Sequence, residues 1–518
     1  MSSLKKTAVI ITIITIGSKI IGFGREVVLA YFFGTSYVVD AYLMAITIPS
    51  ILFGWVNSIS MSYTPIYTDI NLKDGHKKSL SFTNNIISIV LGCSLICIIL
   101  CYLFNRQIVT IFAPGFSGNT FNLTSKFLNI SVFSILFSSV LQVLNAYLNC
   151  NSKFIESSLP MLFFSSTQIV FIVMSGIIST NILIYGYIVA VIMQFFATYL
   201  FSYKECYRFR FNIRITPEIK KTFILVIPIF ISSAIIQINS FVDKSFASIL
   251  AEGSISALNY ANILRSFIFT IFTVAITTMI YPLLSKSITE KNIDAVKNMF
   301  SKSINLTIIL FIPITIGVIL LANPAIQFVY ERGAFSAQST ILTSAAFVMY
   351  SIGILPLALS DIITKVFYSM QDTKSVMITS IISVILNIIL NFLLIKPFKH
   401  NGLALATSLS SIFTIPILFV ILRKKLGLLY LKNSLILLLK SCFSASIMAV
   451  IVYFSFKYFS HLLGIGKINI LISLVISASL GGIVYFVLMV IIRVNEMNFF
   501  VDIICSVLKY LKHKILKK

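Results

Sequence analysis

Residues 18–34 read SKIIGFGREVVLAYFFG, which is largely apolar yet carries Lys19, Arg25 and Glu26. The surrounding apolar run, residues 8–33, is long enough as a helix to cross the roughly 30 Å hydrocarbon core of a bilayer. A charge near the centre of such a helix costs about 2.5 to 3.5 kcal/mol on insertion scales, so charged residues there normally face a bundle interior or an aqueous cavity. The stretch therefore predicts a membrane helix whose charged side chains face the inside of a helix bundle.

The composition extends this prediction to the whole chain. The 518 residues are 58% hydrophobic and only 11% charged, with a mean hydropathy of +0.99, whereas a soluble domain is roughly 25% charged. We expect an all-α polytopic membrane protein with about fourteen transmembrane helices, each of about 20 residues. The predicted spans are 8–33, 38–62, 82–104, 125–149, 159–180, 182–203, 222–250, 256–284, 303–322, 337–368, 375–395, 401–422, 434–456 and 468–492.

The net charge of +24 does not indicate nucleic-acid binding. With the N-terminus placed in the cytoplasm, most Lys and Arg residues fall in cytoplasmic loops and tails, which is the pattern of positive-inside topology. Both termini are then predicted to be cytoplasmic. The densest basic clusters, 204–221, 423–432 and 509–518, are expected to contact anionic lipid headgroups.

Two halves of the chain resemble each other. AYLNCNSK (146–153) matches FYSMQDTK (367–374) at an offset of 221, and apolar spans with similar beginnings and ends lie at nearby offsets. Like halves around a central site are the usual plan of a secondary transporter. The sequence predicts an N-terminal six-helix lobe, a C-terminal six-helix lobe, and two additional helices with a basic cytoplasmic tail, at residues 1–205, 206–428 and 429–518.

The charges of the first span form a candidate gate. Lys19 and Arg25 would point about 120° apart on an ideal helix, but Gly22 and Gly24 between them would allow a kink that presents both to one cavity. Asp40, early in the second span, is predicted to return near Arg25 and Glu26. Arg25, Glu26 and Asp40 are therefore candidate gate residues. The alternative is a static ion pair that only fixes helix packing.

A second polar set lies in the second half. Asp243, Asn387, Asn391 and Thr407 supply oxygen atoms of the kind that bind a hard monovalent cation such as sodium. The alternative is interhelical hydrogen bonding, which is common in membrane bundles. No other cofactor is indicated. Outside these networks the sequence shows no paired acids or nucleophile and base, so we expect a transporter and no enzyme.

Several motifs in order carry a family resemblance: SKIIGFGREVVLAYFFG with DAYLMAITIPS, then EGSISALNYA, YERGAFSAQST, FYSMQDTK and NGLALATS. They resemble the MurJ/MviN lipid II flippases of the multidrug/oligosaccharidyl-lipid/polysaccharide exporter superfamily. The resemblance implies two six-helix lobes around a cationic cavity, a groove formed by the last two spans for the lipid tail, and a place in the bacterial plasma membrane. It implies transfer of an undecaprenyl-diphosphate-linked cell-wall precursor from the inner to the outer leaflet, by a chain that we expect to be a monomer.

The resemblance assigns residues one by one. Lys19 stands at a family Arg, Arg25 at the key family Arg, and Asp40 at the family Asp that opens span two. Asp243, Asn387, Asn391 and Thr407 fall on positions similar to the family's sodium site, with Asn391 where an acid can occur.

Two departures concern the cavity. Phe53 and Ile263 stand where the family usually has Arg, and Arg265, two residues later, is a third candidate for substrate binding beside Lys19 and Arg25.

These departures leave the substrate open. The sequence favours a lipid II flippase. The alternatives are a flippase for another polyprenyl-linked oligosaccharide, such as a capsule or teichoic-acid precursor, and a drug or cation antiporter of the same superfamily.

Overall fold

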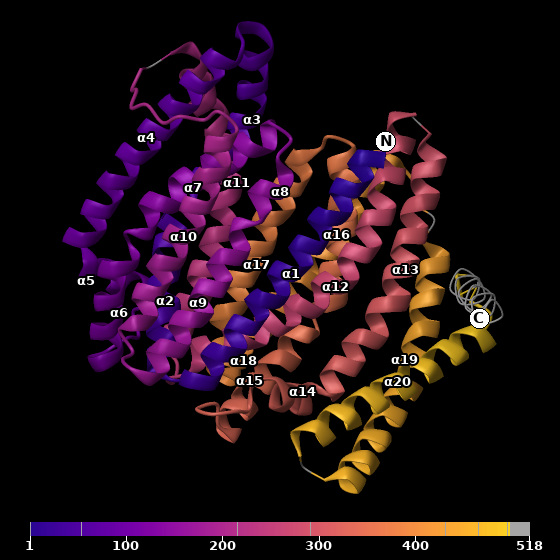
Figure 1. The fold of residues 1–518 in the computed structure, drawn as a ribbon. Coiled ribbons are helices and arrows are strands. Elements are labelled where there is room, and N and C mark those ends of the chain that lie inside the picture. The colour runs from indigo at the N-terminus through magenta and orange to yellow at the C-terminus, as the bar shows by residue number, and fades with distance from the viewer. Residues whose placement is uncertain are drawn as a thin grey trace, which may run out of the picture. The chain divides into compact units, whose positions relative to one another are not determined.

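The computed structural model describes residues 2–52, 54–214, 216–290, 292–429, 431–464, 466–494 and 496–497. In these residues the chain forms helices joined by turns and short extended segments, with no β-strand (Figure 1). Phe53 and the basic cluster 509–518 lie outside the described residues. The expected all-α architecture is confirmed.

The helices cluster into two compact units. The first comprises residues 1–260, 330–342 and 391–403, and the second comprises 261–329, 343–390 and 404–518. The helices up to residue 248 are α1 (Ser2–Phe33), α2 (Tyr37–Leu52), α3 (Trp55–Asp74), α4 (His76–Leu103), α5 (Asn105–Phe112), α6 (Gly118–Ser131), α7 (Ser134–Cys150), α8 (Phe154–Ser158), α9 (Pro160–Ile177), α10 (Ile182–Lys204) and α11 (Pro217–Ser248).

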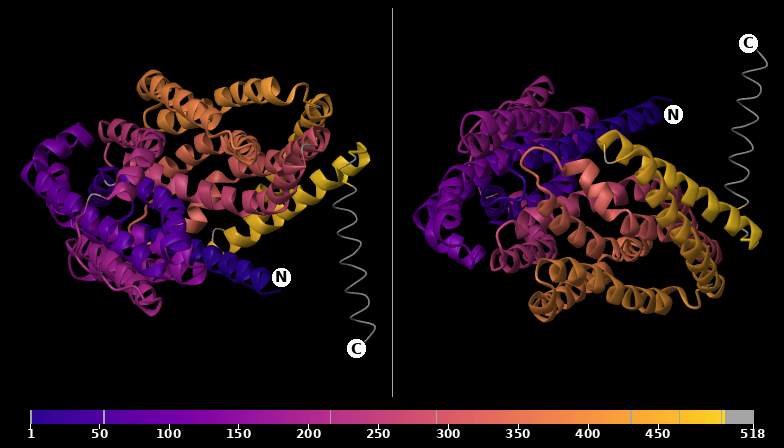
Figure 2. Two further views of the ribbon diagram at one scale, coloured as in Figure 1. Left: turned by 90° about the horizontal axis from the view of Figure 1, so that it is seen from above. Right: turned by 90° about the horizontal axis from the view of Figure 1, so that it is seen from below.

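The remaining helices complete the second unit, and several of them share residues with the first. They are α12 (Ser254–Thr289), α13 (Ile293–Leu320), α14 (Ala322–Tyr330), α15 (Ala337–Ser351), α16 (Ile354–Ser369), α17 (Thr373–Phe398), α18 (His400–Leu426), α19 (Lys432–Leu463) and α20 (Lys467–Ile491). The long helices α19 and α20 pack against each other; in Figure 2 they are the orange-yellow and yellow helices near the C-terminal end of the colour scale. The predicted lobe boundaries at 205 and 428 stay a prediction.

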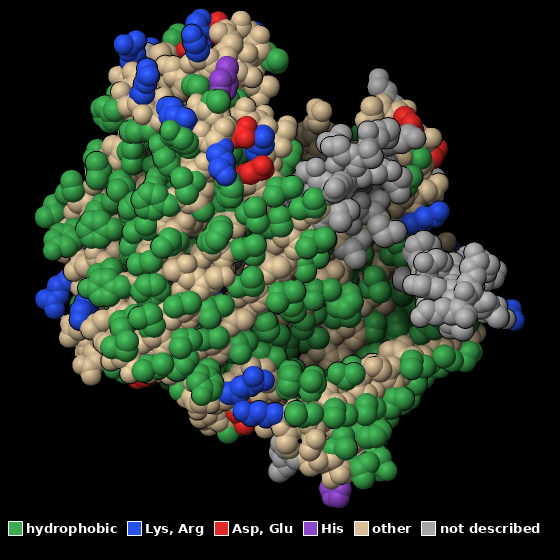
Figure 3. Space-filling model, in the orientation of Figure 1, with side chains coloured by type: hydrophobic (Ala, Val, Ile, Leu, Met, Phe, Trp, Pro, Cys, Tyr) green, Lys and Arg blue, Asp and Glu red, His purple; other side chains and the backbone are tan. Residues whose placement is uncertain are grey.

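Length and apolarity identify the membrane helices. Among the described residues, nine helices are long and apolar enough to cross a membrane, and three further pairs bent by 42° to 45° bring the number to twelve. Two other long helices, α1 and α11, cover the two remaining predicted spans. In Figure 3 the face formed by α4, α9 and α10 is covered by apolar side chains, and Lys and Arg gather toward its ends.

Each unit packs its own core. In the first, stacked aromatic rings dominate: Tyr63 lies between Tyr67 and Phe82 at centroid distances of 5.3 and 5.6 Å. In the second, aliphatic and Phe side chains of α13, α16 and α19 pack together, with Phe311 and Phe367 fully buried. The hydroxyl of Tyr63 shares a hydrogen bond of 2.7 Å with Thr83, so burying this ring does not leave its polar end unpaired.

The two repeated connections have the same backbone geometry. Ser152 and Gln371 both adopt a left-handed conformation (φ 59° and 58°), and the next residues, Lys153 and Asp372, each donate their N–H to a carbonyl five positions back at 2.9 Å. This is a Schellman helix end. The equivalence Lys153 with Asp372 corresponds to an offset of 219, so the sequence offset of 221 is corrected by two residues.

An ion pair recurs at these connections with its charges exchanged. Lys153 pairs with Glu205 at the end of α10 at 2.7 Å, and Asp372 pairs with Lys425 near the end of α18 at 2.5 Å. Partial burial opposes ionisation of Asp372, but hydrogen bonds from Lys425 and Ser375 outweigh it and hold the pKa of Asp372 below its ordinary value. The first ion pair links the turn after α7 to the end of α10. The second links the turn after α16 to the end of α18.

Candidate functional site

Helix α1 carries the predicted cations through one uninterrupted helix. It runs from Ser2 to Phe33 without a break at Gly22 or Gly24, and a methyl group added at either glycine would meet no heavy atom within 4 Å. These glycines are therefore not required for close packing in this conformation. Lys19 is exposed to the surroundings of the protein, whereas Arg25 is three-quarters buried.

Arg25 is the centre of a buried polar network in the first unit. Its Nε donates to Glu26 Oε1 at 3.1 Å, its Nη2 also bonds to Glu26, and its Nη1 donates to Gln168 Oε1 at 2.7 Å. The guanidinium lies 6.0 Å from the ring centroid of Phe164. Because Glu26 supplies the opposite charge, neither ion is buried without compensation.

Residues of three further helices complete the network. Gln168, on α9, also donates through Nε2 to the hydroxyl of Tyr42 on α2 at 3.4 Å. Asn259, on α12, donates to the second carboxylate oxygen of Glu26 at 3.3 Å. The sequence prediction missed Gln168 and Asn259, although Gln168 stands out as a lone amide in the apolar run FFSSTQIVFIV. The network thus joins α1, α2, α9 and α12.

Asp40 lies on α2, and its carboxylate bonds to backbone amides rather than to Arg25. Oδ2 accepts the N–H of Gly253 at 2.7 Å, and Oδ1 accepts the N–H of Ser256 at 2.8 Å. The side chain is buried, with 3% exposed. The first N–H groups of a helix have no partner within the helix, so Asp40 caps the N-terminus of α12 from another helix. The structure therefore brings Arg25 and Glu26 together and gives Asp40 a separate role.

Close backbone contacts surround this cap. Gly253 has φ +86°, and a methyl group built on it would lie 2.5 Å from the carbonyl oxygen of Thr35. Gly333 has φ +58°, and a methyl group there would collide with the carbonyl of Tyr31. Thr35 also shares a hydrogen bond of 2.7 Å with Ser339. The turn between α1 and α2, the turn before α12 and the segment before α15 therefore pack tightly together within the first unit.

The candidate cation ligands form two hydrogen-bonded pairs. In the first unit, Asn391 Nδ2 donates to Asp243 Oδ1 at 2.6 Å. In the second unit, Asn387 Nδ2 donates to Thr407 Oγ1 at 3.3 Å. Lys244, next to Asp243 in sequence, donates to Thr47 Oγ1.

Arg265 is a largely buried cation of the second unit. It lies on α12, with its guanidinium carbon 5.1 Å from the ring centroid of Tyr350. Within the described part of the chain, no hydrogen-bond partner reaches its buried Nε and Nη1 atoms. Buried polar groups are normally paired, so these donors suit an anion that arrives from outside. Ile263, at the position of a family Arg, is half-buried on the same helix.

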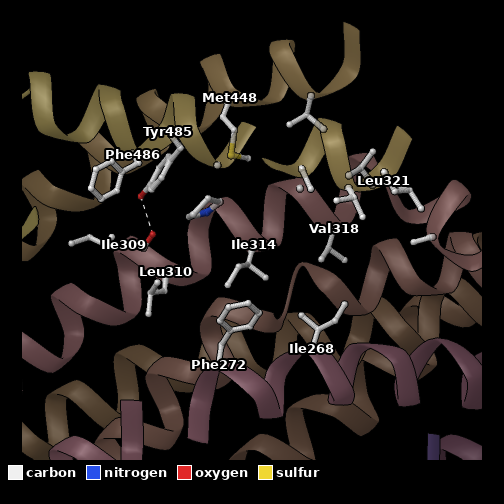
Figure 4. A pocket seen from close by; sticks show the side chains of 18 of the residues that line it. Ile268, Phe272, Ile309, Leu310, Ile314, Val318, Leu321, Met448, Tyr485 and Phe486 are labelled. Atoms are coloured by element: carbon white, nitrogen blue, oxygen red, sulfur yellow. Dashed lines mark hydrogen bonds between the residues drawn. The ribbon is translucent and has the colours of Figure 1, made fainter. Parts of the chain in front are cut away.

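An apolar pocket of about 640 Å³ lies in the second unit. Its walls are Ile268 and Phe272 of α12, residues 309–318 of α13, and side chains of α19 and α20 (Figure 4). In Figure 4, Tyr485 points its hydroxyl toward the carbonyl of Ile309, to which it donates at 3.0 Å. With that hydroxyl satisfied, the pocket offers a hydrocarbon surface.

A family model described as "Lipid II flippase MurJ" matches residues 29–491. The chain belongs to the MurJ family. A probable lipid II flippase MurJ of Buchnera aphidicola subsp. Baizongia pistaciae is 30% identical over 87% of this chain and 90% of its own length. The lipid II flippase MurJ of Thermosipho africanus is 31% identical over 79% of this chain and 84% of its own length.

Solved structures agree with the family. A lipid II flippase MurJ in an inward closed conformation matches with a TM-score of 0.81 and 27% identity, over 96% of this chain and all of that one. An inward-facing multidrug resistance MATE family transporter of the MOP superfamily matches with a TM-score of 0.66 at 10% identity, over 78% of this chain and 94% of that one. The second likeness shows that this MurJ family member shares its fold with MATE transporters.

Proposed function

We propose that the chain moves lipid II from the inner to the outer leaflet of the bacterial plasma membrane by alternating access, for cell-wall synthesis. The observation that carries this proposal is the MurJ family match over residues 29–491, together with the 27% identical MurJ structure. The chain is then a transporter, and its role is to give a polar headgroup a path across the bilayer. We propose that it works as a monomer with both termini in the cytoplasm.

We assign the diphosphate of the substrate to Lys19, Arg25 and Arg265. Arg25 is already held by Glu26 and Gln168, so an incoming diphosphate competes with a carboxylate that imitates its charge. Phosphate oxygens can accept two parallel hydrogen bonds from the planar guanidinium of Arg, a bidentate geometry that Lys cannot form. Exchange of Glu26 for diphosphate would loosen the bond from Asn259 to Glu26 and so link substrate binding to the position of α12.

Gating is assigned to Arg25, Glu26 and Asp40 acting at two neighbouring places. Arg25 and Glu26 respond to the anion, whereas Asp40 holds the N-terminus of α12 in place. Opening requires the two hydrogen bonds that Asp40 accepts from the backbone N–H groups of Gly253 and Ser256 to break. The close contacts at Gly253 and Gly333 must separate as well.

The apolar pocket is proposed to receive part of the polyprenyl tail. Its hydrocarbon walls give the tail no polar partner, so binding there would follow from apolar burial alone. The membrane potential is worth about 2.3 kcal/mol per charge per 100 mV, and an inside-negative potential favours outward movement of an anionic headgroup.

Sodium is the proposed coupling ion, with Asp243, Asn387, Asn391 and Thr407 as ligands. Their donor set is one carboxylate, two amides and one hydroxyl, which suits a hard monovalent cation. Both amides now present their NH₂ groups to oxygen atoms, so holding a cation would require their oxygens to turn inward.

The substrate is tested by comparing lipids on the purified chain. Native mass spectrometry with lipid II, a lipid-linked teichoic-acid precursor and undecaprenyl phosphate measures which headgroup adds affinity. We expect lipid II to bind most tightly, and Arg25→Ala to lose that advantage while Arg25→Lys keeps part of it. Preference for the teichoic-acid precursor would instead support the second flippase reading, which the absent cation at Ile263 favours.

A further inference from the structure

The segment between α10 and α11 is fastened to α4 along its length. We call residues 207–214 the strap; it forms neither helix nor strand, and Tyr207 at its start is 1% exposed with its hydroxyl bonded to Asn84 Oδ1 at 2.9 Å. Side chains from two turns of α4 hold the strap backbone through Asn84 to the carbonyl of Arg208 at 3.1 Å, Ser88 to the N–H of Asn212 at 3.0 Å, and Asn85 to the N–H of Arg214 at 3.1 Å. The strap is therefore a fixed element.

The strap alternates between cationic and apolar residues. Its sequence from 208 to 214 is RFRFNIR, in which Arg or Asn alternates with Phe or Ile. Phe209, Phe211 and Ile213 are 40%, 72% and 56% exposed, and the arginines of the strap are exposed as well. Exposed apolar and cationic side chains thus alternate along the strap, which is the composition of a segment that lies in a membrane interface.

The position of the strap agrees with this pattern. It joins the end of α10 at Lys204 to the start of α11 at Pro217, so it connects two long apolar helices on one side of the membrane. It crosses α4 at residues 84–88, close to residue 82, where the predicted span of that helix begins. Figure 1 shows this segment as the magenta loop beside α4.

An apolar pocket of about 290 Å³ opens beside the strap. Tyr207 and Phe209 of the strap form one wall, and the other walls come from α4, α7 and α10: Ile87, Leu91, Leu136, Phe137, Val140, Phe195, Phe196 and Tyr199. Phe196, on its rim, is 52% exposed, so the pocket faces the lipid side of α10. Its volume is just below the range of about 300 to 1,000 Å³ that pockets for drug-sized ligands occupy.

The first cation of the strap lies beside this pocket. The guanidinium of Arg208 is fixed over the ring of Tyr203 at 3.2 Å, and its Nη1 donates to the carbonyls of Tyr203 and Tyr207 at 2.7 and 2.9 Å. Arg210, two residues on, is exposed as well. A pre-positioned Arg beside an apolar pocket at a membrane boundary matches a phosphate attached to an acyl chain.

We propose that the strap and this pocket bind one anionic phospholipid of the bilayer, with an acyl chain in the pocket and the phosphate on Arg208 and Arg210. The site is separate from Arg25 and does not depend on which substrate the chain transports. Bound there, the lipid covers Phe209 and the pocket wall and neutralises part of the basic segment that follows α10.

The test uses a tryptophan placed at the pocket. The chain has one Trp, Trp55, so Phe209→Trp in a Trp55→Phe background gives a single emitter. The full-length protein is reconstituted in phosphatidylcholine, and phosphatidylglycerol or phosphatidylcholine brominated on the acyl chain is added at equal fractions. We expect brominated phosphatidylglycerol to quench the introduced tryptophan at a much lower fraction than brominated phosphatidylcholine.

Charge variants separate a specific site from general attraction. Arg208→Gln with Arg210→Gln is expected to raise the half-quenching fraction of brominated phosphatidylglycerol about thirtyfold, because the two cations near the surface together contribute about 2 kcal/mol to binding anionic lipid. Arg208→Lys with Arg210→Lys, which keeps both charges, should retain most of the preference. The matched control, Lys457→Gln with Lys467→Gln, removes two exposed cations from α19 and α20 and should change nothing.

Three outcomes overturn the proposal. Equal quenching by the two brominated lipids would mean that the introduced tryptophan contacts only bulk lipid. No quenching by either would mean that no acyl chain enters the pocket. Relief of quenching by substoichiometric undecaprenyl phosphate would make a polyprenyl chain the occupant.

Discussion

Removing the Asp40 carboxylate should release the N-terminus of α12. The carboxylate accepts two short bonds, from Gly253 at 2.7 Å and Ser256 at 2.8 Å, in a place where only 3% of the side chain is exposed. A hydrogen bond to a charged group contributes about 1.5 to 3 kcal/mol. Taking the lower value for each, Asp40→Ala costs about 3 kcal/mol, which is roughly a hundredfold change in the local opening equilibrium.

Hydrogen exchange followed by mass spectrometry reads this equilibrium directly, because amides that open locally exchange in proportion to their open population. In peptides covering residues 250–258, Asp40→Ala should speed exchange of the capped amides by about a hundredfold. Asp40→Asn should speed exchange of these amides by about tenfold. The Asn side chain keeps one oxygen that accepts a hydrogen bond, but its NH₂ group faces the other backbone N–H donor and cannot accept from it.

The control is Asp361→Asn, which removes a half-buried acid of α16 in the other unit and should leave this peptide unchanged. If Asp40→Ala exchanges within about twofold of the native chain, the carboxylate does not cap α12, and its assignment to the gate fails with it.

Three other variants test separate parts of the structure. Gly253→Ala should lower the thermal midpoint of the purified protein by an amount that corresponds to at least about 1 kcal/mol, because its φ of +86° and the Thr35 carbonyl at 2.5 Å disfavour a methyl group; an unchanged midpoint would contradict the tight contact. Asp372→Lys or Lys425→Asp alone should lower the free energy of unfolding by no more than about 1 kcal/mol, because the ion pair is partly exposed. The double variant, in which the two charges are exchanged, should recover most of that free energy. If the two losses simply add in the double variant, the side chains do not interact. Asp243→Asn should abolish any thermal stabilisation by sodium over potassium; stabilisation that survives would exclude Asp243 as a ligand.

The positions of the membrane spans were predictable because each membrane helix needs about 20 apolar residues, and apolar runs of that length can be seen directly in the sequence. The helices of the structure cover all of the predicted spans, including α1, where the charges of residues 18–34 interrupt the apolar run. Burial of Arg25 beside Glu26 was also foreseeable, because a buried cation requires a nearby anion.

The partners of Asp40 were not predictable in the same way. A backbone N–H carries no side-chain signature, so the sequence could only propose another charged residue, Arg25, as the partner. The same reason explains the two-residue error in the offset between the repeated connections. The Schellman turns at Ser152 and Gln371 are defined by backbone conformation, which a comparison of residue types does not detect.

The strap illustrates a third limit. Its basic residues were expected to contact lipid headgroups, and the RFRFNIR alternation was visible in the sequence. What the sequence did not show is that Asn84, Asn85 and Ser88 of α4 hold the segment beside a pocket, because these contacts join positions more than 120 residues apart.

The most direct test of the central claim is the amount of lipid II in the outer leaflet of a bacterium depleted of its resident lipid II flippase and expressing this chain. The native chain is predicted to restore outer-leaflet lipid II, and Arg25→Ala, present in the membrane at the same level, is predicted not to. Failure of the native chain to restore it despite good membrane expression would contradict lipid II transport, and full restoration by Arg25→Ala would remove Arg25 from the mechanism.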